Sequence, residues 1–241
     1  MINKIAILAA GKGTRMRELA TDKPKHLIEV NGKPFLWHVL NNANLAGYKE
    51  IILVGGHYFE KMQEFVESVK HEFNITLVNQ FEVMGEEKYG TAIPVLAAKD
   101  ALQGEQFVCF YGDNLYSSKD LAALKSLDDE FQYVSILHHK HPENYGVPIV
   151  EGELVKDFVE KPKQFISNWI SVGCYKFTSE IFEALEKVEK SERGEYELTD
   201  AISSLAKLGK VKSRKMLDYW MDFGNPDDIQ KVAEFLESGK A

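Results

Sequence analysis

An apolar segment that stops abruptly at a glycine-bearing turn constrains this chain more than any other feature. The residues from Ile5 to Leu8 carry no charge, and they are followed by Ala9-Ala10-Gly11-Lys12-Gly13-Thr14-Arg15. The apolar run predicts a buried strand of a parallel sheet. Glycines let the backbone of such a turn come close to a ligand, and its successive amide groups can form a concave anion site. The pattern therefore indicates a strand followed by a turn that could bind a polyphosphate.

The same short stretch contains more basic than acidic side chains: Lys12, Arg15, Arg17, Lys23 and Lys25 against Glu18 and Asp22. It is not a Walker loop, because no G-K-[S/T] closes a G-x-x-x-x-G spacing. It is not a dinucleotide fingerprint either, because Met16 holds the third glycine position. On pattern alone, an ordinary strand-to-helix turn with solvated charges is as well supported as a phosphate site.

Apolar strands alternate with helical patterns through the first half of the chain, which predicts a doubly wound, mostly parallel α/β sheet. A ligand of such a sheet binds at the carboxyl ends of the strands, where the glycine turn lies. In the second half, short strands follow one another closely and predict a smaller antiparallel portion. Further strands are expected at 50–54, 75–78, 107–111, 133–137, 147–150, 154–159 and 171–177, and helices at 34–46, 57–70, 121–127, 178–190, 201–207 and from 226 onward.

Composition limits the classes of function. The chain has 241 residues, of which 44% are hydrophobic and 27% charged, and these values are ordinary for a globular protein. Its formal net charge of −8 argues against partners such as nucleic acid or an anionic membrane. No signal peptide or membrane-length apolar run is visible, so we expect a cytoplasmic protein. The two cysteines, Cys109 and Cys174, lie in apolar strand-like segments and predict buried, unreactive thiols.

The segment AAGKGTRM followed by KPKHL resembles the signature of sugar-1-phosphate nucleotidyltransferases, the enzymes that make nucleotide sugars. Further elements of that family follow in its order: GDN at 112–114, YG at 145–146, EKP at 160–162, RGEYELTD at 193–200 and WMDFGNP at 220–226. Taken singly, GDN could be a turn that ends a strand, and EKP a charged loop. Together, the elements extend the resemblance from Ile5 to the last helix.

The resemblance implies a role for residues in each motif. Arg15 and Lys25 would be catalytic, and Asp113 and Asp222 would bind Mg²⁺. The other implied positions are Ala10, Gly11, Gly13, Thr14, Gln80, Gly90 and Thr91 for the nucleotide, and Gly146, Glu160, Lys161 and Val172 for the sugar phosphate. From the residues alone, Thr91 could instead be the N-cap of the helix that follows it.

The implied activity is Mg²⁺-dependent transfer of a nucleotidyl group from UTP, dTTP or CTP to a sugar 1-phosphate. The resemblance also implies one domain over residues 1–241, with a nucleotide part at about 1–115 and a sugar-phosphate part at about 130–225. No C-terminal β-helix is expected. A homo-oligomer would agree with the family.

Three alternatives stay open. The acceptor could be a non-sugar phosphate such as phosphocholine, with Trp169 and Tyr175 as candidates for an aromatic cage. The chain could be a non-catalytic paralogue that binds nucleotide sugars. A Rossmann dehydrogenase is opposed by Met16, and by Gly55-Gly56 at the place where the ribose-binding acid would lie.

Overall fold

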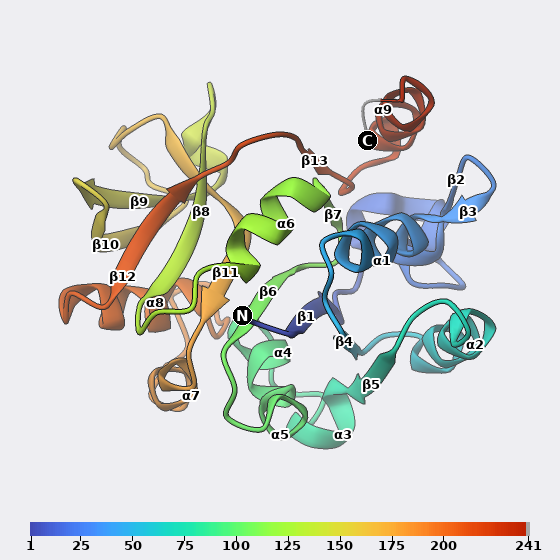
Figure 1. Cartoon of the computed structure of the whole chain (residues 1–241), viewed down its shortest axis with the longest axis horizontal. Coiled ribbons are helices and arrows are strands. Elements are labelled where there is room, and N and C mark those ends of the chain that lie inside the picture. Colours follow the sequence, from blue (N-terminus) through green and yellow to red (C-terminus); the bar gives the residue numbers. More distant parts are fainter. Residues whose placement is uncertain (240–241) are drawn as a thin grey trace.

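The computed structural model describes residues 1–239, apart from the side chains of Arg17 and Glu18. Both side chains belong to the stretch that follows the glycine turn. They and residues 240–241 are outside the part of the chain that the structure describes. A nine-stranded sheet runs through the molecule with helices on both faces (Figure 1). The strand order is β5-β4-β1-β6-β11-β8-β12-β10-β9. This is the α/β architecture that the sequence predicts.

The first four strands of this order are parallel to one another. They are β5 (Ile75–Asn79), β4 (Glu50–Gly55), β1 (Lys4–Ala9) and β6 (Phe107–Tyr111). Their bounds agree with the predicted strands to within a residue or two. Because neighbouring parallel strands end at one edge of the sheet, the turn after β1 lies beside the residues that follow β6.

The strands of the second half continue the same sheet. β11 (Trp169–Phe177) pairs antiparallel with both β6 and β8 (Gln132–His138). β12 (Val211–Lys215), which the sequence pattern does not indicate, then pairs parallel with β8. The hairpin of β9 (Gly146–Glu151) and β10 (Leu154–Glu160) forms the far edge. The antiparallel portion is therefore joined to the parallel part through β11 and shares its core.

The helices form two layers. One face is covered by α1 (Phe35–Leu45), α2 (Phe59–Val69), α6 (Ser118–Lys125) and α9 (Pro226–Glu237), and the other by α4 (Ala92–Ala97), α5 (Lys99–Leu102), α7 (Glu180–Leu185) and α8 (Leu198–Lys207). α7 ends earlier than the predicted helix at 178–190. The remaining elements are α3 (Gln80–Met84), 3-10 helices at Thr14–Ala20, Lys25–Leu27 and Pro142–Asn144, and the short strands β2 (Glu29–Val30), β3 (Lys33–Pro34), β7 (Asn114–Tyr116) and β13 (Trp220–Asp222).

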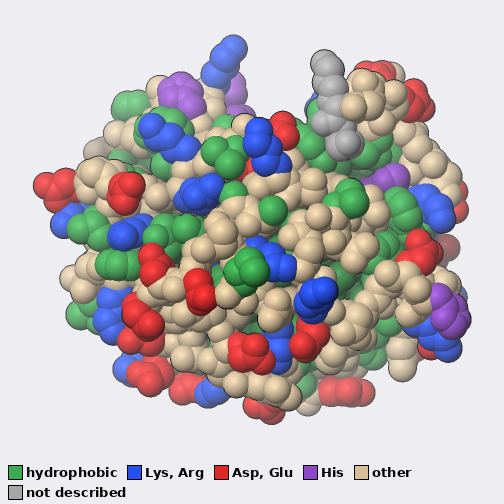
Figure 2. All heavy atoms as spheres, in the orientation of Figure 1, with side chains coloured by type: hydrophobic (Ala, Val, Ile, Leu, Met, Phe, Trp, Pro, Cys, Tyr) green, Lys and Arg blue, Asp and Glu red, His purple; other side chains and the backbone are tan. Residues whose placement is uncertain are grey.

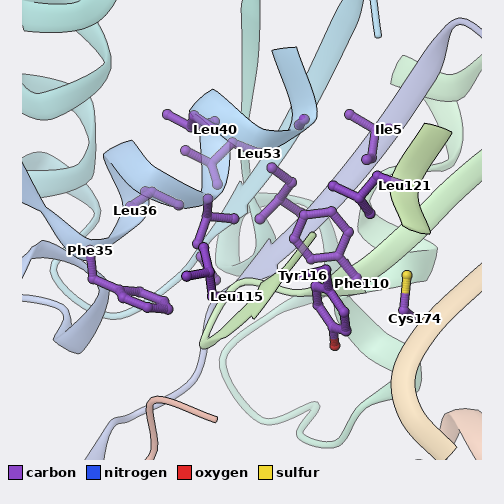
Figure 3. Packing of buried hydrophobic residues seen from close by; sticks show 14 of the residues in the cluster. Ile5, Phe35, Leu36, Leu40, Leu53, Phe110, Leu115, Tyr116, Leu121 and Cys174 are labelled. Carbon is purple, nitrogen blue, oxygen red and sulfur yellow. The ribbon is translucent and has the colours of Figure 1, made fainter. Parts of the chain in front are cut away.

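Alternation along β1 explains how one strand supports both layers. Ile5 and Ile7 face the α1 side, whereas Ala6 and Leu8 face the α4 side. On the α1 side, Phe110 packs with Tyr116, and their ring centroids lie 5.0 Å apart (Figure 3). Cys109 and Cys174 are buried free thiols, as expected.

The surface has a mixed charge character. Acidic and basic side chains are interspersed over the face shown in Figure 2. Among the described residues, no helix combines the length and the apolar character that a membrane span requires.

Replacing Phe110 should destabilise the fold strongly. Its side chain is fully buried, and a Phe→Ala change in a core costs about 3–5 kcal/mol. Chemical denaturation of Phe110→Ala should show this loss. Phe165→Ala is the matched control, because Phe165 is 74% exposed and its loss should change stability by less than about 0.5 kcal/mol. Equal losses in the two variants would contradict this description of the core.

Candidate active site

A cavity of about 490 Å³ opens at the carboxyl ends of β1 and β6, and residues of both halves of the chain line it. This size is within the range of small-molecule sites. Every residue assigned to a site from the sequence lines this one cavity: Ala10, Gly11, Gly13, Thr14, Arg15, Lys25, Gln80, Gly90, Thr91, Asp113, Gly146, Glu160, Lys161, Val172 and Asp222.

The glycine turn is packed directly over the side chain of Lys25. Gly13 has a left-handed backbone with φ of 64°, and a Cβ atom at this position would lie 3.4 Å from the Lys25 Cβ. Met16, which occupies the place of a third glycine, is fully buried and anchors the following 3-10 helix to the core. The aliphatic part of the Lys25 side chain therefore packs beneath the turn, and its ammonium group extends beyond the turn.

In the free protein that partner is Asp113. Lys25 Nζ lies 2.5 Å from Asp113 Oδ2, and Asn114 Nδ2 donates to Asp113 Oδ1 over 2.9 Å. Burial pushes the pKa of Asp113 upward, but the charges of Lys25 and its neighbourhood more than offset this, and the pKa lies below its ordinary value. Asp113 is therefore ionised at neutral pH and held in a fixed orientation.

Asp222 reaches the cavity on a two-stranded ribbon. β13 pairs antiparallel with β7, so that Asp222 lies opposite Asn114. Phe223 N donates to the carbonyl of Asp113 over 2.8 Å, which ties the two acidic positions together. Burial and then the negative charge of Asp113 raise the pKa of Asp222 to about 6. The guanidinium of Arg15 lies nearby: a Cβ on Gly224 would be 3.6 Å from Arg15 Cζ.

These two carboxylates fit a divalent cation. After burial, the negative charge of Asp113 is the next cause that raises the pKa of Asp222, and a cation between the two carboxylates would offset this repulsion. No group of three or more His, Cys, Asp and Glu side chains with metal-site geometry occurs in the described part of the chain. Two carboxylates suffice for Mg²⁺, because this ion keeps several waters and takes its other ligands from phosphates.

The other end of the cavity is formed by the end of β10. Lys161 directly follows β10 with a left-handed backbone (φ 44°), and its amide donates to the carbonyl of Tyr145 over 3.1 Å. Burial raises the pKa of Glu160 above its ordinary value, although the positive charge of Lys161 lowers it in part. Gly146 is closely packed, because a Cβ there would lie 2.3 Å from the Phe158 ring.

Arg193 adds a charged cluster that the sequence analysis did not assign to the site. Its Nη2 lies 3.1 Å from Glu195 Oε2 and 3.0 Å from Glu197 Oε1, and its Nη1 is 4.0 Å from Glu160 Oε1. All four side chains line the cavity. In the sequence, the R-x-E-x-E spacing within RGEYELTD signals this cluster; in the structure a turn at Arg193 and Gly194 brings its charges together.

The floor of the cavity is a bulge in β11. The pairing of β11 with β8 shifts register between Ser171 and Tyr175. Gly173, with φ of 72°, approaches the Tyr111 ring so closely that a Cβ would lie 2.3 Å from it. Tyr116 Oη donates to the carbonyl of Val172 over 2.5 Å. The Val172 carbonyl is thus engaged by a buried tyrosine, which fixes the backbone of the bulge beside the cavity.

A close backbone contact joins the first half of the chain to the second half. A Cβ on Gly90 would lie 2.3–2.4 Å from backbone atoms of Tyr196, so only glycine fits. The Ala92 amide donates to the Tyr196 carbonyl over 2.9 Å. The hydroxyl of Thr91 does not cap the helix that follows it; instead it accepts from the Leu198 amide over 2.9 Å, at the start of α8.

The aromatic residues of the site differ from those considered in the sequence. Tyr175 lines the cavity, but Trp169 does not; its ring contacts His138 and Lys215. A cage built from Trp169 and Tyr175 is therefore wrong. Tyr145 and Trp220 line the cavity instead, with ring centroids 5.8 Å apart.

Known proteins share both the sequence and the fold. The family model for nucleotidyl transferases matches residues 4–239. The bifunctional protein GlmU of Methanocaldococcus jannaschii is 38% identical over 232 residues, which are 95% of this chain and 53% of that protein. This chain thus spans about half the length of such relatives. The UTP–glucose-1-phosphate uridylyltransferase AglF of Haloferax volcanii is 32% identical over 96% of this chain and 95% of its own length.

A solved structure of UDP-glucose pyrophosphorylase in complex with UDP-glucose superposes with a TM-score of 0.85 at 23% identity. The superposition covers 99% of this chain and all of the other. At this level of identity the likeness concerns the fold.

Replacing Asp222 with Asn should stabilise the cation-free protein at high pH. Because folding raises the pKa of Asp222 to about 6, the ionised carboxylate costs stability above that pH, and the cost disappears below about pH 4, where the unfolded chain is also protonated. Thermal melts in EDTA should therefore show a gain of a few degrees at pH 8, consistent with roughly 2–4 °C per kcal/mol. The gain should vanish near pH 4.

The matched control is Asp218→Asn, which changes an exposed carboxylate of the same segment. It should not reproduce the pH-dependent gain. A gain of Asp222→Asn that is equally large at pH 4 and pH 8 would rule out charge repulsion as its cause.

Proposed function

Because this chain belongs to the nucleotidyl transferase family, we propose that it transfers a nucleotidyl group from a nucleoside triphosphate to a sugar 1-phosphate and releases pyrophosphate. The observation that carries the proposal is the single cavity with a cationic group near each end. Lys25 lies under the glycine turn, Lys161 follows β10, and both line the same cavity. A reaction between two anions needs this arrangement, since the protein must hold them together against their repulsion.

The triphosphate belongs at the glycine turn. The turn from Gly11 to Thr14 follows a parallel strand, where the backbone can bind an anion. Arg15, near Gly224, would neutralise the departing pyrophosphate, and the ammonium of Lys25 would lie over the α-phosphate. Gln80, Gly90 and Thr91 would contact the base and ribose. The close contact of Gly90 with Tyr196 keeps this wall of the cavity in place.

The sugar phosphate belongs at the end of β10. Lys161 would hold its phosphate, and the carboxylate of Glu160 would accept hydrogen bonds from sugar hydroxyls. Gly146 and Val172 supply backbone surface beside them. A sugar is better supported than phosphocholine as the acceptor, because Glu160 and Gly146 line this end of the cavity and Trp169 does not.

Asp113 and Asp222 would hold Mg²⁺, which when bound would neutralise phosphate charge. Asp113 Oδ2 is the atom that Lys25 contacts in the free protein. The same carboxylate therefore pairs with the Lys25 ammonium in the free protein and would bind the metal ion when Mg²⁺ is present. Asn114 orients it in both, through its bond to Oδ1.

The chemistry requires little proton transfer. An oxygen of the sugar phosphate attacks the α-phosphorus, the bond from that phosphorus to the bridging oxygen breaks, and pyrophosphate leaves in line. The attacking phosphate is already ionised near neutral pH, so no general base is needed. The contribution of the chain is to position both reactants and to offset their charge.

We propose UTP and glucose 1-phosphate as the first pair to test. The support is AglF, whose name states this reaction and whose length this chain covers almost completely. The same assay includes dTTP, CTP and other sugar 1-phosphates, so that it identifies both the base and the sugar.

Pyrophosphate release should show the activity and its dependence on Lys161. With Mg²⁺, wild-type protein should release pyrophosphate with at least one pair in a grid of nucleoside triphosphates and sugar 1-phosphates. Lys161→Met should lower kcat/KM by about 100-fold, since loss of one preorganised charge contact costs roughly 3 kcal/mol in the transition state.

Lys163→Met is the control, because Lys163 is exposed and does not line the cavity. It should retain wild-type activity. A grid without pyrophosphate release, in which wild-type and Asp113→Ala proteins are indistinguishable, would refute the proposed reaction.

A further inference from the structure

A buried carboxylate outside the cavity, that of Asp120, has no cationic partner among the described residues. Asp120 is 3% exposed and lies in the first turn of α6. Its oxygens accept three hydrogen bonds. Ser117 Oγ donates to Oδ2 over 2.7 Å, the Leu217 amide to Oδ1 over 2.6 Å and the Asp218 amide to Oδ2 over 3.0 Å. Hydrogen bonds from amides to an ionised acceptor are about twice as strong as those between neutral groups.

Asp120 does not complete the cap of its own helix. Ser117 is the N-cap of α6, and its hydroxyl accepts from the Asp120 amide over 3.0 Å. In a capping box, the acidic side chain at this third helical position would accept the N-cap amide in return. Here the Ser117 amide donates to the carbonyl of Tyr219 instead, over 3.2 Å. The carboxylate of Asp120 is directed to the segment that leads into β13.

That segment carries Asp222. Leu217 and Asp218 lie shortly before β13, whose pairs with β7 are Trp220 with Tyr116, Met221 with Leu115, and Asp222 with Asn114. The ribbon has only three residues in each strand. A two-stranded ribbon of this length is marginal by itself, and a slip of one residue would turn every side chain to the opposite face. Its register therefore depends on contacts at its ends.

We propose that Asp120 is a positioning residue: its buried carboxylate fixes the register of β13 against β7 and thereby directs Asp222 into the cavity. Asn42 supports the same ribbon, through bonds from Nδ2 to the Tyr116 carbonyl and to the Tyr219 hydroxyl. Asp120 supplies the charged contacts at the point where the segment approaches β13. The importance of this for catalysis rests on the proposed role of Asp222 in the reaction.

The test compares Asp120→Asn with Ser117→Ala. The Asn side chain keeps the size of Asp but has only one acceptor oxygen, so at least one of the two amides loses its partner. Mn²⁺ serves as the probe, and its binding to the protein is measured without substrates by electron paramagnetic resonance. We expect Asp120→Asn to bind Mn²⁺ at least 10-fold more weakly, which is the loss typical of residues that orient a metal ligand.

Ser117→Ala removes the helix cap and the bond that the Ser117 hydroxyl donates to Asp120, but it leaves the bonds that the Leu217 and Asp218 amides donate to Asp120. It should lower the melting temperature and leave Mn²⁺ affinity unchanged. If Asp120→Asn does not fold, Leu217→Pro replaces it: this change removes one amide donor from the other side of the contact, and it should weaken Mn²⁺ binding in the same way.

The proposal is overturned if Asp120→Asn lowers the melting temperature as Ser117→Ala does but binds Mn²⁺ like the wild type. It is also overturned if the wild-type protein binds no Mn²⁺. Because this measurement needs no turnover, it is independent of the substrate grid. If no substrate pair releases pyrophosphate but Asp120→Asn still binds Mn²⁺ at least 10-fold more weakly than wild type, the proposed reaction is rejected and the role of Asp120 is retained.

Discussion

The ion pair between Lys25 and Asp113 joins the two strand ends on which the site is built. Lys25 belongs to the segment after β1, and Asp113 follows β6, which pairs directly with β1. The strands are parallel, so their ends meet at one edge of the sheet. The Gly112 amide donates to the carbonyl of Leu8 over 2.8 Å, so the two chain segments are still bonded where they leave the sheet. The register of β1 with β6 thus places Asp113 beside the glycine turn, and Lys25 meets it there because its stem packs under Gly13.

The second half of the chain is tied to this edge at two places. β13 pairs with β7 immediately after Asp113, and the segment at Tyr196 lies against Gly90. Each tie is a backbone contact and therefore has little freedom to change its length. Because the sheet itself continues from β6 into β11, the two walls of the cavity belong to one packed unit. A fixed separation of the walls supports the proposed reaction, in which two anions must be held close together.

Sequence reasoning identified the parts of this molecule that depend on local pattern. The apolar run at Ile5–Leu8 predicted β1, and Asn225-Pro226 correctly predicted the start of α9, where a capping box is present. The positions around the cavity came from motif resemblance, which places residues without explaining their contacts. Contacts between residues far apart in the sequence could not be predicted in this way. Nothing near Thr91 in the sequence indicates that its hydroxyl accepts from the Leu198 amide, and nothing near Trp169 indicates that it lies outside the cavity. Asp120 likewise looks like an ordinary helix-start acid until its partners are seen.

The two lysines of the free site differ in whether they already have a charged partner, and this difference couples nucleotide binding to cation binding. Lys161 forms no ion pair among the described residues, so an incoming phosphate can take it without displacing another group. Lys25, by contrast, is buried and already paired with Asp113. A triphosphate that recruits Lys25 leaves Asp113 unpaired beside Asp222. Even with Lys25 in place, burial and then the charge of Asp113 raise the pKa of Asp222, so the repulsion would grow. A cation that takes over the two carboxylates removes this cost. Nucleotide and divalent cation should therefore each strengthen the binding of the other, and the coupling must be equal in both directions.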